Sequence, residues 1–220
     1  PGIWVPTTAS TRDGRPEVIV GSADLATGKR IYVFNYKGQL LLESIQLDGP
    51  IVGIPAVGDV IPGDNGELEI VATTNTSTGN SLYVFDIPAS LMVLNIAPTY
   101  QKAIGASKSS PAVGRGLQSD TYQSVFVTTT NNLLQWWKWE AVATCADGSP
   151  GPFCRQGASA NLTCVNTTTA DPNDYRSMNH FTNGTLAVCQ SNLLMESSPL
   201  VASLQAASPI RVFTPSQDAL

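Results

Sequence analysis

The feature that most constrains this chain is an internal repeat of short, strand-like segments. Three copies open on related segments that share a proline followed by small and apolar residues: Ile54–Asp59, Ser110–Arg115 and Ser198–Ser203, with Trp4–Thr7 as a degenerate first copy. After a polar turn each copy continues with a β-branched run: Glu17–Gly21, Glu69–Thr73, Ser124–Thr128 and Ile210–Thr214. Such residues favour strands. A repeat of roughly 50 residues built from strands indicates a row of similar β-sheet units.

Each unit also offers a third and a fourth strand. The third strands are Ile31–Asn35, Leu82–Asp86 and Leu134–Lys138, and the fourth are Gly38–Ser44 and Leu91–Asn95. We therefore predict an all-β chain of four-stranded antiparallel meanders, similar to the blades of a β-propeller that is incomplete or part of a larger one. One repeat domain, 1–220, would hold modules 1–50, 51–106 and 107–140, an insertion at 141–195 and a truncated module at 196–220.

The predicted insertion contains all four cysteines, which are Cys145, Cys154, Cys164 and Cys189. They lie in polar sequence rich in glycine and proline, which favours two disulfides that staple the loop, with three pairings open. A zinc site is the competing interpretation. No pair of cysteines has the close spacing typical of zinc ligands, and the chain has a single histidine, His180.

Four sequons of the form Asn-x-Ser/Thr predict N-linked glycans. They begin at Asn75, Asn161, Asn166 and Asn183, and three of them lie in the cysteine-bearing segment. Disulfides and N-glycans form in the same oxidising compartment. We therefore expect an extracellular or cell-surface protein that follows the secretory pathway, and a chain that starts at Pro1 fits a processed mature protein or a fragment.

Charge and hydropathy limit the classes of partner that the chain is expected to bind. The formal net charge is −5, and the lysines and arginines are scattered, so the chain has no basic stripe for a phosphate backbone. Apolar runs stop far short of the roughly 20 residues of a membrane span. The expected partners are other extracellular proteins or copies of this chain, together with the N-linked glycans, without nucleic acid and without a membrane span in this segment.

Motifs in the first two copies resemble a known repeat family. Pro-Ala-Val-Gly-Asp at 55–59, an acidic glycine-containing loop, Pro-Glu-Val-Ile-Val-Gly at 16–21 and Tyr-Val-Phe at 83–85 are similar to FG-GAP or VCBS repeats, the class found in the β-propeller head of integrin α chains. The resemblance is best from Pro6 to Ala89. It implies a propeller fold and an adhesive role.

The same resemblance implies a calcium site in the loop after the first strand. In the second copy the candidate ligands are Asp59, Asp64, Asn65 and Glu67. Pro62 and Gly63 lengthen this loop relative to the family pattern, and the other copies lose most of the acidic residues. The alternative is an ordinary turn built by Asp, Asn and Gly. No cofactor is certain from the sequence, and calcium is the one candidate.

Catalytic motifs are weak. His180 has no nucleophile elbow near it, and the sequence has no glycine-rich phosphate loop, so whether the chain is an enzyme stays open, with a non-catalytic role favoured. The segment Trp136-Trp137-Lys138-Trp139 is the most unusual feature. Trp136 and Trp139 are candidates for an exposed aromatic platform. The alternative is that Trp137, aligned with Phe34 and Phe85, packs between blades while Trp136 or Trp139 covers the base of the insertion.

Together these features predict a non-catalytic extracellular glycoprotein module with a structural, adhesive or protein–protein interaction role. Self-assembly into a filament by strand addition is one form that such a role could take. The alternative is a propeller that binds carbohydrate or degrades polysaccharide.

Overall fold

A computed structural model gives the fold of most of the chain. It describes residues 2–4, 17–23, 28–62, 68–76, 81–87, 93–105, 107–115, 121–129 and 134–158, together with short strands at 180–182, 185–187, 200–202 and 211–213. Within these residues every regular element is a β-strand and there is no helix. The all-β prediction is therefore confirmed.

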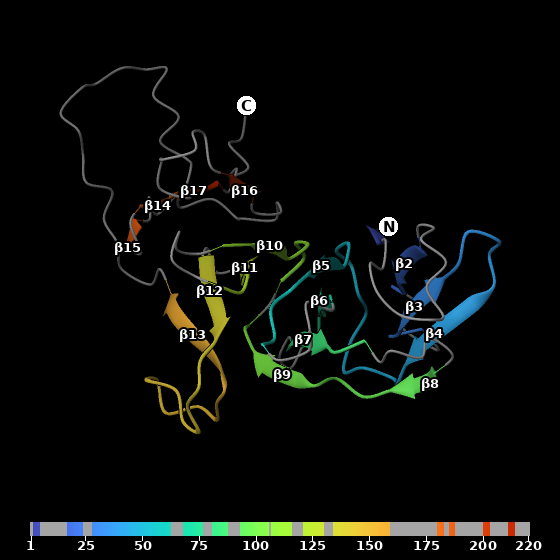
Figure 1. The fold of residues 1–220 in the computed structure, drawn as a ribbon, viewed down its shortest axis with the longest axis horizontal. Coiled ribbons are helices and arrows are strands. Elements are labelled where there is room, and N and C mark those ends of the chain that lie inside the picture. The colour runs from blue at the N-terminus through green and yellow to red at the C-terminus, as the bar shows by residue number, and fades with distance from the viewer. Residues whose placement is uncertain are drawn as a thin grey trace, which may run out of the picture.

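The strands form three larger sheets and two hairpin-like pairs (Figure 1). The first sheet has the order β1 (Gly2–Trp4), β2 (Glu17–Gly21), β3 (Ile31–Phe34), β4 (Leu40–Ser44) and β8 (Val93–Ile96). The second contains β5 (Ala56–Gly58), β6 (Glu69–Thr73), β7 (Ser81–Phe85) and β9 (Tyr100–Ala103). The third contains β10 (Ala112–Gly114), β11 (Ser124–Thr128), β12 (Leu134–Trp139) and β13 (Phe153–Ala158). The pairs are β14 (His180–Thr182) with β15 (Thr185–Ala187), and β16 (Leu200–Ala202) with β17 (Arg211–Phe213).

The three larger sheets share one antiparallel meander and one internal register. Phe34, Phe85 and Trp137 occupy the same place in their sheets, because they pair with Val18, Ile70 and Val125 at the second position of the second strand. The first strands of successive sheets contact one another: β1 with β5, β5 with β10, and β10 with β16. The outer strands β8, β9 and β13 lie away from this row (Figure 1). The described sheets follow one another as blades do, and they do not form a closed ring.

The core covers both faces of the two central strands of the second sheet. All five residues of β6 and all five of β7 are buried, which requires cover on both faces. Ile70 and Phe85 pack with the first sheet in one apolar cluster. Val71 and Val84 pack with the third sheet in another. Each large apolar side chain buried in this way contributes about 1.5–3 kcal/mol to stability.

The fourth strand of the second sheet is not where the sequence placed it. The prediction of Leu91–Asn95 is wrong, because β8 (Val93–Ile96) joins the first sheet, parallel to β4, and β9 supplies the missing strand. The reason lies in the side chains. Ile96 is buried in the cluster of the first sheet, whereas β9 alternates between half-buried and exposed side chains and carries little apolar signal.

The predicted insertion 141–195 also begins too early. β13 lies inside that range and is the fourth strand of the third sheet, paired with β12. Residues 140–152 are therefore a long connection within one sheet.

The first strand of the first copy starts earlier than the sequence indicated. The register of Trp4 with Glu17 matches that of Gly58 with Glu69. Pro1, and not Pro6, therefore corresponds in sequence to Pro55.

Candidate functional site

The tryptophan segment of β12 divides between two faces of the third sheet. Trp137 is buried between the second and third sheets and stacks on Phe153, with ring centroids 6.3 Å apart. This confirms that Trp137 packs between neighbouring sheets. Trp136 lies on the other face and stacks on Phe126, also at 6.3 Å. Trp136 is only 4% exposed. The prediction that it forms an exposed platform is therefore wrong.

Trp139 is the half-buried member of the segment. It packs partly against the apolar cluster that contains Trp137, as strand alternation predicts for residues two apart. The rest of the side chain borders a hollow of about 420 Å³ at the end of the third sheet. The residues that line this hollow come from the β10–β11 connection and from the end of β12: Thr121, Tyr122, Gln123, Lys138, Trp139, Glu140 and Ala141.

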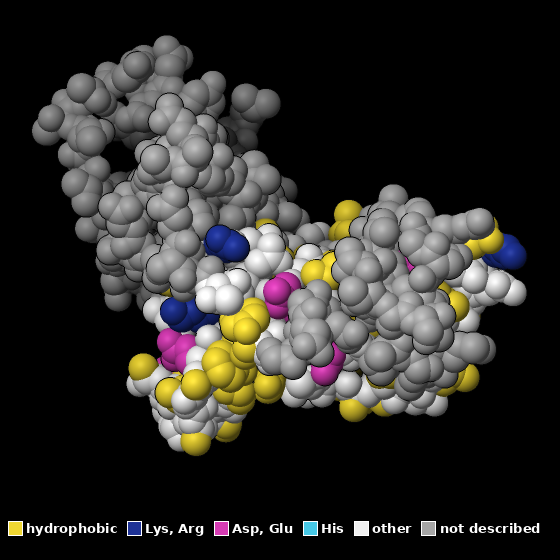
Figure 2. All heavy atoms as spheres, viewed as in Figure 1, with side chains coloured by type: hydrophobic (Ala, Val, Ile, Leu, Met, Phe, Trp, Pro, Cys, Tyr) yellow, Lys and Arg dark blue, Asp and Glu magenta, His cyan; other side chains and the backbone are white. Residues whose placement is uncertain are grey.

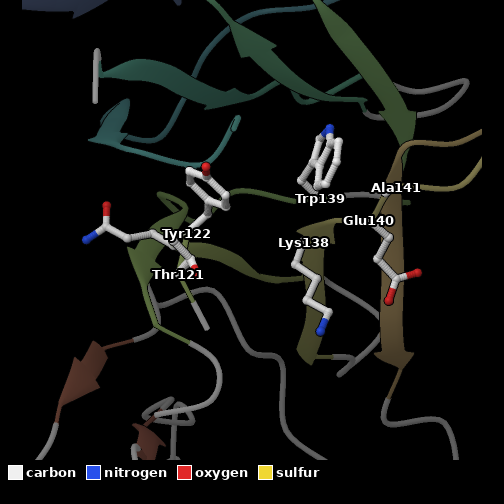
Figure 3. A pocket seen from close by; sticks show the side chains of 7 residues that line it. Thr121, Tyr122, Lys138, Trp139, Glu140 and Ala141 are labelled. Carbon is white, nitrogen blue, oxygen red and sulfur yellow. The ribbon is translucent and has the colours of Figure 1, made fainter. Parts of the chain in front are cut away.

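The hollow has an aromatic side and a charged side. Figure 3 shows the rings of Tyr122 and Trp139 directed to one side, with Lys138 and Glu140 directed to the other. Lys138 also lies over the ring of the buried Trp136, 5.6 Å from its centroid, a distance at which a cation is attracted to the ring. Figure 2 shows hydrophobic side chains gathered over the nearby β12–β13 connection, beside acidic and basic ones.

Main-chain hydrogen bonds fix both walls of the hollow. Gln123 donates its N–H to the carbonyl of Asp59 at 2.7 Å, and its Oε1 accepts from the Asp59 N–H at 3.0 Å. These two bonds attach the β10–β11 connection to the second sheet. On the other wall, Glu140 donates its N–H to the carbonyl of Pro152 at 2.7 Å. The hollow is therefore formed by anchored backbone on both sides.

A disulfide lies in the β12–β13 connection, which follows the wall formed by Glu140. Cys145 and Cys154 are bonded, with their Cα atoms 5.4 Å apart, and both residues are buried. Cys164 and Cys189 lie outside the described residues, so a second disulfide stays a prediction. The observed bond closes the second part of the β12–β13 connection and ties it to the second residue of β13.

Charged groups hold the turn inside the disulfide loop. Asp147 Oδ1 accepts hydrogen bonds from the hydroxyl and the N–H of Ser149, at 2.7 and 3.0 Å, and these bonds hold the pKa of its carboxyl below the usual range. Arg155 of β13 lies 3.5 Å from the same carboxylate. Lys102 of β9 donates to the carbonyl of Pro150, and burial lowers the pKa of its ammonium. The loop is thus attached to the second sheet as well.

The structure describes one of the four predicted N-glycosylation sites, Asn75. Asn75 is half-buried in the β6–β7 connection, where its N–H donates to the carbonyl of Pro50 at 2.9 Å. Asn161, Asn166 and Asn183 lie outside the described residues. N-glycosylation at all four positions stays a prediction.

Of the four candidate calcium ligands, the structure describes one, Asp59. Asp64, Asn65 and Glu67 lie outside the described residues, and Asp59 contributes its backbone to the contact with Gln123. The carboxylate of Glu69 occupies the start of this loop, because its Oε2 accepts N–H groups of Val60 and Ile61 at 2.6 and 3.0 Å. In the described part of the chain no three acidic, histidine or cysteine side chains are grouped as metal ligands are.

A polar cluster that sequence reasoning missed joins the first two sheets. Asp48 follows β4 and accepts hydrogen bonds from the hydroxyls of Thr74 and Ser81, at 2.5 and 2.6 Å. Its N–H contacts the hydroxyl of Tyr83 at 3.3 Å, and Gln101 donates to the same hydroxyl at 3.0 Å. Burial raises the pKa of the Tyr83 hydroxyl above its usual value. In the sequence Asp48 is one polar residue of a connection.

Comparison with known proteins adds no family name. No protein-family model matches the chain, and no curated protein matches it. Among the described residues there is no helix with the length and apolar character that a membrane crossing requires.

Proposed function

We propose that the chain is a non-catalytic extracellular glycoprotein module with a structural or adhesive role, built as part of a propeller of the FG-GAP or VCBS type. The disulfide between Cys145 and Cys154 is compatible with an oxidising compartment. Asn75 lies in a connection between strands, where a glycan could extend into solvent. Three stacked sheets with buried interfaces supply a rigid frame for presenting a surface.

One observation carries the interaction role. The first sheet already accepts a strand from outside its own meander, because β8 adds to the edge of β4 in parallel. Leu94 of β8 is 61% exposed, and Leu40 and Ile45 of the neighbouring segment are also exposed. An exposed apolar side chain on an outermost strand favours pairing with another chain. β8 is four residues long, so the added contact would be weak and visible at high concentration.

Sedimentation of the secreted protein over a range of concentrations tests this proposal. We expect self-association of the unmodified chain and its loss in Leu94→Lys, because a charge on an edge strand opposes strand addition. Val142→Lys is the matched control, since Val142 is an exposed apolar residue in the β12–β13 connection and not in a strand. A chain that stays monomeric at about 1 mM would contradict strand addition, as would an association that Leu94→Lys leaves unchanged.

A second candidate is carbohydrate binding, and the hollow beside Trp139 favours it. Among the described residues that line the hollow, Glu140 is the one carboxylate. Hydrolysis of a glycosidic bond usually needs two carboxylates across the bond. The described residues therefore support carbohydrate binding.

A further inference from the structure

We propose that the hollow bordered by Tyr122 and Trp139 binds a neutral pyranose ring of a glycan, with the indole of Trp139 as its stacking surface. The inference deepens the carbohydrate-binding candidate and rests on the extracellular location proposed above. It assigns a ligand class and separate roles to the two sides of the hollow.

The aromatic side suits the apolar face of a sugar ring. Tyr122 and Trp139 are both half-buried, so each ring is anchored yet keeps surface for a ligand. Their side chains point to the same side of the hollow (Figure 3). The volume of about 420 Å³ lies in the range of small-ligand sites. A gluco-configured pyranose presents C–H groups on both faces of its ring, and an aromatic ring packs against such a face.

The charged side suits hydroxyl groups rather than a charged ligand. Glu140 supplies acceptors and Thr121 can both donate and accept. The ammonium of Lys138 lies over the ring of Trp136, on the face of β12 opposite to Trp139, so it borders the hollow without facing the indole. The charges of Lys138 and Glu140 are opposite, so the described residues of the hollow do not present a field of one sign to a phosphate, a sulfate or a cation. A ligand with many neutral hydroxyls matches this mixture of donors and acceptors.

The walls are organised before a ligand arrives. Gln123 is bonded twice to the backbone of Asp59, and Glu140 is bonded to Pro152 in the disulfide-closed connection. A site whose backbone is already fixed loses little conformational freedom on binding. The disulfide closes the part of this connection that contains Pro152, the acceptor of the Glu140 N–H.

The predicted glycan at Asn75 would leave this site free. The hollow lies at the end of the third sheet where β11 starts, next to Asp59 at the corresponding end of the second sheet. Asn75 comes two residues after Thr73, the last residue of β6, and so lies at the opposite end, where the Thr73 hydroxyl donates to the carbonyl of Ser109. A five-residue strand separates the two ends by roughly 17 Å.

Titration calorimetry with cellotriose and chitotriose tests the assignment. We expect the secreted chain, with its own glycans trimmed, to bind at least one of the two probes. Trp139→Ala should weaken binding by roughly tenfold or more, because it removes the stacking surface. Tyr122→Ala, outside the strands, is the second variant in case Trp139→Ala fails to fold. Tyr36→Ala is the matched control, since Tyr36 is an exposed aromatic residue in another turn.

Three results would overturn the assignment. These are no binding of either probe at millimolar concentration, binding that both hollow variants leave unchanged, and binding of sulfated or sialylated oligosaccharides in preference to neutral ones. Secretion and glycan attachment are measured on the same sample. A secreted, glycosylated chain that binds neither probe removes only this inference, whereas a chain that is not secreted removes the extracellular proposal as well.

Discussion

At the scale of single residues, polar side chains determine how the sheets are joined. Asp48 connects the segment after β4 to Thr74 and Ser81 of the second sheet. Glu69 in the same way binds two N–H groups of the loop after β5. Apolar packing is tolerant of small shifts, whereas these hydrogen bonds fix one arrangement, because a buried hydroxyl or N–H without a partner costs free energy.

Replacing Asp48 measures this contribution. Asp48→Ala removes the acceptor of two buried hydroxyls, and we expect the free energy of unfolding to fall by about 1–3 kcal/mol. Urea denaturation followed by circular dichroism is the measurement. Glu43→Ala is the matched control, because Glu43 pairs with Arg30 at 3.2 Å while both side chains stay 24% exposed, so we expect a smaller loss of about 1 kcal/mol. Equal losses in the two variants would contradict a special role for Asp48.

Sequence reasoning reached some of these residues and missed others for physical reasons. The alignment of Phe34, Phe85 and Trp137 predicted the packing of Trp137 between sheets, because repeated positions share an environment. Trp136 was misjudged, since alternation gives its face but does not say whether that face is covered. Tyr122 was not found, because its role depends on a turn that meets the end of β12 in space.

At the scale of elements, the β12–β13 connection is the unusual part of the third sheet. It is long, it contains the turn around Asp147, and its disulfide joins Cys145 to the start of β13. Cysteine content predicted a stapled segment. The order of the strands around it was not predictable, because β13 has the mixed sequence Phe-Cys-Arg-Gln-Gly-Ala and little apolar alternation.

Removing this disulfide tests its structural role. In the double variant Cys145→Ala and Cys154→Ala we expect a loss of about 2–4 kcal/mol, as is typical when a native disulfide no longer restricts the unfolded chain. Thermal unfolding of the oxidised variant gives the change, and amide hydrogen exchange should show faster opening of residues 140–152. If the melting temperature and the exchange of this segment are unchanged, the connection is held by its hydrogen bonds alone.

At the scale of the whole molecule, the repeat predicted much of the architecture. Periodic β-branched runs gave the all-β class and the four-stranded meander, since each sheet needs neighbours to cover its faces. The parallel addition of β8 to the first sheet could not be predicted, because it depends on where a connection passes in space and not on local pattern. Burial of Ile96 and a hydrogen bond from Arg30 to Asn95 help to hold this long-range contact.

The central claim is that this β-sheet module is an extracellular glycoprotein. Peptide mass mapping of the protein secreted by eukaryotic cells, before and after treatment with peptide N-glycosidase, tests it directly at Asn75, the one sequon asparagine that the structure describes. We predict a glycan on the peptide that contains Asn75 and conversion of this residue to aspartate on enzyme treatment. An unmodified Asn75 in all of the secreted protein, or retention of the chain in the cytosol, would contradict the claim.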